Sequence, residues 1–216
     1  MARGTDDLID TLVDDLRPIG AGSVARTLSV GIGGGLIVAF GLMIAMLGMR
    51  PDLSAAAATS AYWIKFFYTL ALGIVAFAAV ERLARPSGEA ARALWAAAIL
   101  LAAVAALAAL QLSGAPPEAR MPLVMGTSAQ KCPWLIVILS LPVLAGATAA
   151  MRRLAPTRPT LGGFWVGICA GAFGGFVYAL HCDEAGIPFL SLWYTAGMLA
   201  VGALGALFGR HLLRWR

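Results

Sequence analysis

Two cysteines, Cys132 and Cys182, are the side chains of this sequence best suited to chemistry. Cys132 stands directly before one long apolar segment, and Cys182 stands directly after the next. A thiol can be oxidised, and as a thiolate it binds soft metal ions. Two thiols act together only if the fold brings them close, so the chemistry depends on how the apolar segments are arranged.

The apolar segments are typical of a membrane protein. The chain is 60% hydrophobic and 12% charged, with a mean hydropathy of +0.84, and soluble domains rarely reach such values. A spanning helix needs roughly 17–25 residues. Six segments qualify: 28–49, 62–80, 93–112, 134–151, 161–180 and 189–208. The sequence therefore predicts an all-α membrane protein with a six-helix transmembrane bundle over 28–212, a tail over 1–27 and a basic C-terminus over 209–216.

The basic residues predict how the bundle is oriented. Of the 16 Lys and Arg residues, 12 fall in the two termini, the second loop and the fourth loop. Lys and Arg concentrate on the cytoplasmic side of membrane proteins, so both termini are expected to be cytoplasmic. Because consecutive spans run antiparallel, Cys132 and Cys182 are then expected together on the outer side of the membrane.

The surroundings of the two thiols leave three interpretations open. Cys132 precedes Pro133, which is favoured as the first residue of a helix, and a helix N-terminus stabilises a thiolate. Imidazole and carboxylate groups flank Cys182, so a soft metal ion such as zinc, cadmium or copper is a candidate ligand, and no other cofactor is indicated. The pair is a metal- or redox-responsive site, a structural disulfide, or two unrelated thiols. The candidate metal ligands are Cys132, Cys182, His181, Asp183 and Glu184.

The spans contain almost no ionisable side chains. Lys65 is the only one inside a span, and it is expected to extend toward the membrane surface. Ion-coupled carriers usually place charged groups within the bilayer, so the sequence argues against a carrier and against acid–base catalysis. We therefore expect a protein that is not an enzyme. Pro142 should kink the fourth span, either as a static bend or as a hinge that transmits a change at Cys132.

Glycines recur at helical spacing in three spans. Gly163, Gly167, Gly171 and Gly175 mark one helix face that another backbone can approach closely. The glycines at 31 and 33–35, and those at 205 and 209, are expected to do the same. The outer loop over 113–131 shows no obvious secondary structure and either covers the thiols or is a plain connector.

The N-terminal tail is acidic and amphipathic. Apolar residues recur at helical spacing between aspartates, Thr5 can cap the helix, and Pro18 ends it. Such a helix suits an apolar groove on a basic protein, because an anionic membrane surface would repel it. Alternatively, the tail folds back onto the arginine-rich loops of the bundle. The residues expected to bind a partner are Asp6, Leu8, Ile9, Asp10, Leu12, Val13, Asp15 and Leu16.

Several strings of the sequence, taken in order, resemble the NrsF-type transmembrane anti-sigma factors of proteobacteria. The strings are Asp6-Asp7-Leu8-Ile9-Asp10-Thr11-Leu12, Asp15-Leu16-Arg17-Pro18, Cys132-Pro133-Trp134, Leu139-Ser140-Leu141-Pro142, Arg152-Arg153-Leu154-Ala155-Pro156-Thr157, Tyr178-Ala179-Leu180-His181-Cys182 and Trp193-Tyr194-Thr195. The resemblance implies a multi-pass inner-membrane protein that holds an extracytoplasmic-function sigma factor until an envelope signal releases it. It also implies that the two outer cysteines, matched by Cys132 and Cys182, take part in responding to heavy metals or oxidants.

The resemblance favours a regulator of transcription over two rival classes. The partner is then a sigma factor on the cytoplasmic side, with the lipid bilayer around the bundle and no direct contact with nucleic acid. A membrane thiol–disulfide oxidoreductase is the first rival, but the chain has three cysteines and no Cys-x-x-Cys motif. A small metal or solute permease is the second, and the lack of buried polar ligands weighs against it.

Overall fold

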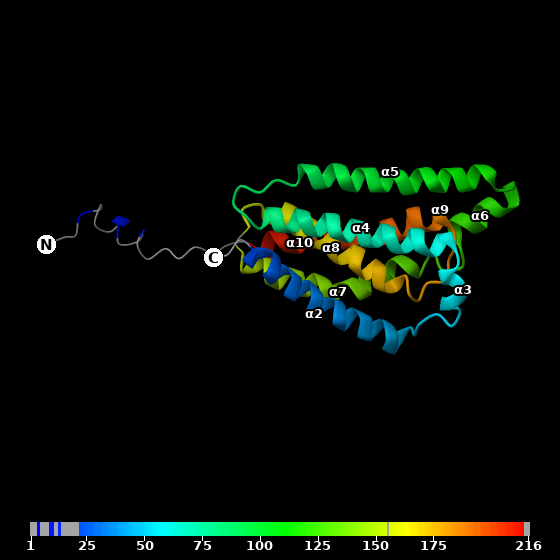
Figure 1. Cartoon of the computed structure of the whole chain (residues 1–216), viewed down its shortest axis with the longest axis horizontal. Coiled ribbons are helices and arrows are strands. Elements are labelled where there is room, and N and C mark those ends of the chain that lie inside the picture. The colour runs from blue at the N-terminus through cyan, green and yellow to red at the C-terminus, as the bar shows by residue number, and fades with distance from the viewer. Residues whose placement is uncertain (1–3, 5–8, 11–12, 14–21, 155, 214–216) are drawn as a thin grey trace.

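The computed structural model of the chain describes residues 4, 9–10, 13, 22–154 and 156–213, and every regular element within them is a helix. The elements are α2 (Ser23–Met46), α3 (Leu53–Ala57), α4 (Ser60–Leu83), α5 (Ala91–Gly114), α6 (Pro117–Met125), α7 (Cys132–Arg152), α8 (Pro159–Tyr178), α9 (Ile187–Phe189), the π-helical turn η1 (Leu190–Tyr194) and α10 (Thr195–Leu212). The long helices run side by side, and the short helices α3 and α6 both lie at the same end of the bundle (Figure 1).

Six helices are long and apolar enough to cross a membrane, as many as the sequence predicts. They are α2, α4, α5, α7, α8 and the run Ile187–Leu212, in which α9, η1 and α10 follow without interruption. Because the number of spans is even, α2 begins and α10 ends at the same end of the bundle (Figure 1). The cytoplasmic location of that end remains a prediction.

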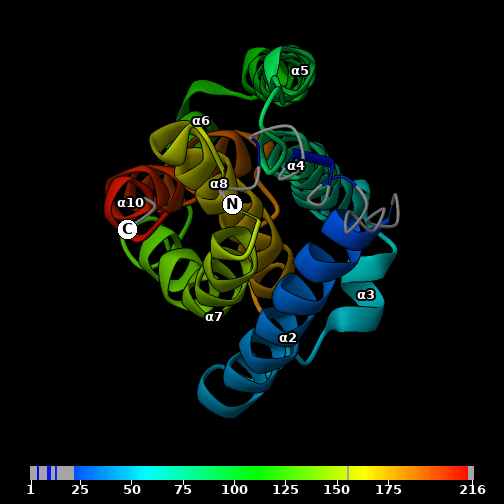
Figure 2. The same ribbon diagram turned by 90° about the vertical axis from the view of Figure 1, so that its left-hand side faces the viewer.

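Helix α8 forms the centre of the bundle. In its most apolar window 72% of the residues are buried, against 17% in α5. Seen along the bundle, α8 is enclosed by α4, α7 and α10, whereas α5 stands apart at the edge (Figure 2). The core is therefore built around one helix whose small residues allow its neighbours to come close.

Glycines set the closest helix contacts, as the sequence predicts for α8. A Cβ atom on Gly163 would collide with the carbonyl oxygen of Gly205, and one on Gly167 would lie 2.8 Å from the Cα of Gly202. In α2 the prediction holds only in part. Gly31 packs against the backbone of α7, as does Gly35, but the glycines at 33 and 34 have no neighbouring atom within 4 Å of such a Cβ.

One local prediction needs correction. The outer loop over 113–131 contains α6, whose start is favoured by Pro117 at its first position and Glu118 in its first turn. The side chain of Lys65 is 3% exposed and donates to carbonyl oxygens of the connection after α8, at the end of the bundle, and its depth in a membrane stays a prediction. Helix α7 continues through Pro142 from Cys132 to Arg152, and the hinge stays a prediction.

Candidate functional site

The two thiols lie at the end of the bundle that holds α3 and α6. Cys132 is the first residue of α7, and Cys182 lies in the connection between α8 and α9. Both side chains are buried and neither is in a disulfide, since Cys132, Cys169 and Cys182 are all free. Cys169 is buried in the middle of α8, away from this end, and packs there as a small apolar side chain.

The carboxylate of Glu184 joins the segment of Cys182 to the turn before Cys132. Its Oε1 atom accepts hydrogen bonds from the backbone and hydroxyl of Thr127, at 2.7 and 2.8 Å, and from the backbone and hydroxyl of Ser128, at 3.1 and 3.0 Å. Ser128 in turn accepts a 2.8 Å hydrogen bond from the backbone N–H of Cys132. Glu184 is thus a clamp between the two cysteine segments.

Two basic side chains hold the backbone around Cys182. Lys65 donates to the carbonyl oxygens of Cys182 and Glu184, at 3.1 and 2.6 Å. Arg50 donates to the carbonyl oxygen of Cys182 at 3.2 Å and forms a 2.7 Å ion pair with Asp52. The segment is therefore fixed from α4 and from the α2–α3 connection.

Polar groups around the sulfur of Cys182 favour its ionised form. A hydrogen bond from the Cys132 thiol is the largest cause that lowers the pKa of Cys182 to about 6, and Lys65 and Tyr194 act in the same direction against the effect of burial. The hydroxyl of Tyr194 is buried and has no hydrogen-bond partner among the described residues. The ring of Tyr194 lies 5.7 Å from that of Tyr178, at the end of α8. These neighbours therefore favour the thiolate form of Cys182.

The candidate metal ligands do not gather into one cluster. His181 contacts the carbonyl oxygen of Gly48 through Nδ1 at 3.0 Å, Glu184 is engaged by the turn at 127–128, and Asp183 is exposed. Within the described part of the chain, no three His, Cys, Asp or Glu side chains are placed to share a metal ion. A ligand set limited to Cys132 and Cys182 suits a soft ion with few ligands better than a tetrahedral zinc site.

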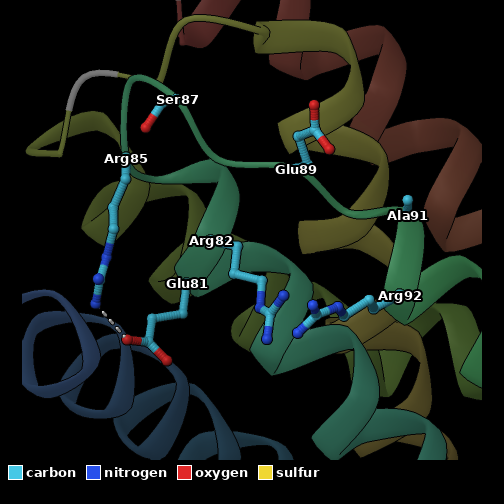
Figure 3. Close-up of a pocket in the computed structure, with 7 residues that line it drawn as sticks. All are labelled: Glu81, Arg82, Arg85, Ser87, Glu89, Ala91 and Arg92. Atoms are coloured by element: carbon cyan, nitrogen blue, oxygen red, sulfur yellow. Dashed lines mark hydrogen bonds and ion pairs between the residues drawn. The ribbon is translucent and has the colours of Figure 1, made fainter.

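The opposite end of the bundle has a basic pocket of about 640 Å³ at the α4–α5 connection. Arg85 forms a 2.8 Å ion pair with Glu81, while the guanidinium groups of Arg82 and Arg92 point toward one another (Figure 3). Neither Arg82 nor Arg92 forms an ion pair within the described residues. The remaining lining residues are Ser87, Glu89 and Ala91. This pocket can receive an anionic group.

Most of the predicted partner-binding residues lie outside the described part of the chain. These are Asp6, Leu8, Leu12, Asp15 and Leu16. The other three, Ile9, Asp10 and Val13, are helical and exposed. The predicted amphipathic helix stays a prediction.

Sequence reasoning did not identify the groups that surround the thiols. Lys65 contacts the Cys182 segment from a helix distant in sequence, and the Tyr194 ring lies beside Lys65. Thr127 and Ser128 bind Glu184, which was expected to be a metal ligand. One signal was available for Lys65: it is the only charged residue inside a predicted span. Tyr194 was marked only as part of the string Trp193-Tyr194-Thr195, which gave it no role at the thiols.

Comparison with known proteins gives consistent full-length matches. The family model described as "Negative regulator of sigma F" matches residues 12–215. The chain is similar to a protein of Azospira oryzae named "Probable anti-sigma-F factor NrsF", with 40% identity over 214 residues, 98% of this chain and 99% of the relative. It is also similar to the "Anti-sigma-F factor NrsF" of Caulobacter vibrioides, with 40% identity over 212 residues and the same coverage of both chains. No solved structure matches the chain.

Proposed function

The chain belongs to the NrsF family of negative regulators of sigma F, and on that premise we propose that it sequesters an extracytoplasmic-function sigma factor at the inner membrane. The observation on which this depends most is the extent of the match, which includes part of the tail and all six spans. A role in regulation, not catalysis, follows from the same membership.

The acidic tail is the proposed binding element. Its apolar residues would insert into a groove of the sigma factor, since buried apolar anchors usually contribute most of the binding energy. The aspartates would speed and orient the encounter with a basic surface. The exposed side chains of Ile9 and Val13 support this proposal, because apolar side chains on the surface of a charged segment commonly mark an interaction site.

The arginine-rich end of the bundle is the proposed cytoplasmic side. Support comes from the positions of Arg82, Arg85 and Arg92 at the α4–α5 connection and of Arg152 and Arg153 at the end of α7. The thiol end then lies in the periplasm. In this arrangement the signal must pass along the bundle from the thiols to the tail.

The thiols are the proposed point at which the signal enters. A heavy-metal ion or an oxidant would act on Cys132 and Cys182, which lie at the start of α7 and just after α8. A change there would alter how these two helices pack and would release the tail from the sigma factor. Moving a two-state equilibrium from 1:99 to 99:1 takes about 5.5 kcal/mol. Forming or breaking a disulfide or metal site is of that order.

The tail gives the decisive experiment. Replacing Leu8 and Leu12 together with serine should abolish co-purification of the sigma factor and raise sigma-dependent transcription without an inducer, because both apolar anchors are lost. The measurement is a pull-down from solubilised membranes beside a transcriptional reporter. Thr11→Ser, between the two leucines, is the matched control and should bind normally.

The comparison is valid only if each variant protein is present in the membrane in the same amount. If the leucine variant still retained the sigma factor at wild-type levels, the tail would not be the binding element. Recovery of a thioredoxin-like protein in place of a sigma factor would contradict the anti-sigma function itself.

A further inference from the structure

Two arginines face each other across the basic pocket at the α4–α5 connection. Arg82 lies in the last turn of α4 and Arg92 in the first turn of α5, and their guanidinium groups point toward one another (Figure 3). The nearby carboxylates do not neutralise them, since Glu81 pairs with Arg85 and Glu89 is directed away from both arginines (Figure 3). Two cations that face each other repel unless an anion lies between them. The pocket therefore has a place for one negatively charged group.

The start of α5 adds hydrogen-bond donors to the same pocket. Ala91, the first residue of α5, lines the pocket, and this helix end has neither a side-chain cap nor an acidic residue in its first turn. The first N–H groups of a helix have no acceptor within the helix and carry a partial positive charge. An anion between Arg82 and Arg92 can therefore accept hydrogen bonds from backbone and guanidinium groups together.

The pocket lies at the depth where lipid headgroups meet the spanning helices. Both α4 and α5 are candidate membrane spans, and the pocket is formed where α4 ends and α5 begins. Trp95, one turn after Arg92, has an exposed side chain, and tryptophan is enriched at the interface between membrane and water. Lipid phosphate groups lie at this level, and basic pockets between spanning helices are known to bind them.

An exposed apolar stripe runs from each arginine toward the middle of its helix. On α5, Ile99 lies seven residues after Arg92. On α4, Ala78 and Ile74 lie four and eight residues before Arg82. Residues at these spacings share one helix face. A phospholipid matches this arrangement, with its phosphodiester between the arginines and its acyl chains along the stripes, whereas a free phosphate or an acidic peptide would leave the stripes unused.

We propose that the pocket between Arg82 and Arg92 binds the phosphodiester headgroup of an anionic phospholipid, and that this lipid links α5 to the rest of the bundle. Protein contacts hold α5 weakly, because 17% of its most apolar window is buried and it stands at the edge of the bundle (Figure 2). The proposal goes beyond the proposed function and does not depend on it, since it requires only that the chain spans a membrane.

The test compares lipid binding by the full-length protein and by two variants that lose the same charge. Native mass spectrometry of the protein in detergent counts bound lipids as phosphatidylglycerol, which is anionic, or phosphatidylcholine, which is zwitterionic, is added. The first variant combines Arg82→Gln with Arg92→Gln. The matched control combines Arg152→Gln with Arg153→Gln, which removes two positive charges at the same end of the bundle.

The wild type should prefer phosphatidylglycerol to phosphatidylcholine. The first variant should bind phosphatidylglycerol about tenfold more weakly, which corresponds to the loss of roughly one charge-assisted hydrogen bond. The control should differ from the wild type by less than about twofold, because exposed charges outside the pocket contribute little. Equal losses in the two variants, or no preference for phosphatidylglycerol in the wild type, would overturn the proposal.

A second readout separates the lipid from other anions. Hydrogen–deuterium exchange of the peptide covering 89–95 should slow when phosphatidylglycerol replaces phosphatidylcholine in the wild type, but not in the first variant. Inorganic phosphate at the same concentration should give no protection, because it lacks acyl chains. Equal protection by phosphate would assign the pocket to a free anion. Lipid binding that appears only after deletion of residues 2–17 would assign it to the acidic tail, and either result would contradict a lipid site.

Discussion

Removal of the Glu184 carboxylate should loosen the turn that precedes Cys132. Glu184 Oε1 accepts four hydrogen bonds from Thr127 and Ser128 at 2.7–3.1 Å, and Glu184→Ala deletes all of them. A hydrogen bond to a charged group contributes about 1.5–3 kcal/mol net. The four bonds share one oxygen on a half-buried side chain, so we take the value of one such bond, about 2 kcal/mol.

A loss of about 2 kcal/mol corresponds to about a 30-fold increase in the population of the open turn, since 1.4 kcal/mol is a factor of ten. Hydrogen–deuterium exchange of the peptide covering 126–131 in nanodiscs measures this, because the amides of Thr127 and Ser128 are themselves donors to Glu184. Asp183→Ala is the matched control, an adjacent exposed carboxylate, and should leave exchange unchanged. An increase of less than threefold in Glu184→Ala would refute the clamp.

Two further predictions follow from the same contacts and from the glycine packing. Burial raises the pKa of Glu184, but the hydrogen bonds from Thr127 and Ser128 outweigh it and lower the pKa below 4.5. The stabilisation of the turn by Glu184 is therefore fully present above about pH 4.5 and is lost as the pH falls further. Hydrogen–deuterium exchange, corrected for its intrinsic pH dependence, should show this loss in the wild type and not in Glu184→Ala. Gly163→Ala places a Cβ against the carbonyl oxygen of Gly205 and should destabilise the bundle by about 1–3 kcal/mol in a thermal melt in detergent, whereas Gly33→Ala meets no atom within 4 Å and should melt like the wild type.

The sequence is sufficient to predict the architecture because hydropathy and length constrain a membrane helix strongly. All six spans were predicted, and the placement of Cys132 and Cys182 at one end follows from their antiparallel order. The face of α8 marked by Gly163 and Gly167 was predicted because only glycine permits that approach of two backbones. These features depend on local composition alone.

The details of the site depend on contacts between distant residues, which no local pattern records. The contacts of Lys65 were not predicted, because its acceptors lie 117 and 119 residues later in the chain. Glu184 was expected to bind metal, but four nearby donors on Thr127 and Ser128 engage its carboxylate. The π-helical turn at Leu190–Tyr194, which brings Tyr194 toward Cys182, has no periodic signature in an apolar span.

The distance along the chain between Lys65 and its acceptors also affects how the protein is made. At about 5–20 residues per second, a ribosome reaches Glu184 some 6–25 s after it has synthesised Lys65. During that interval the nascent α4 holds an ammonium group with no partner, and an unpaired lysine is unfavourable within a bilayer. Until the connection after α8 has been synthesised, Lys65 is therefore expected to lie among the lipid headgroups. A chain truncated before Cys182 would therefore lack both hydrogen-bond acceptors of Lys65.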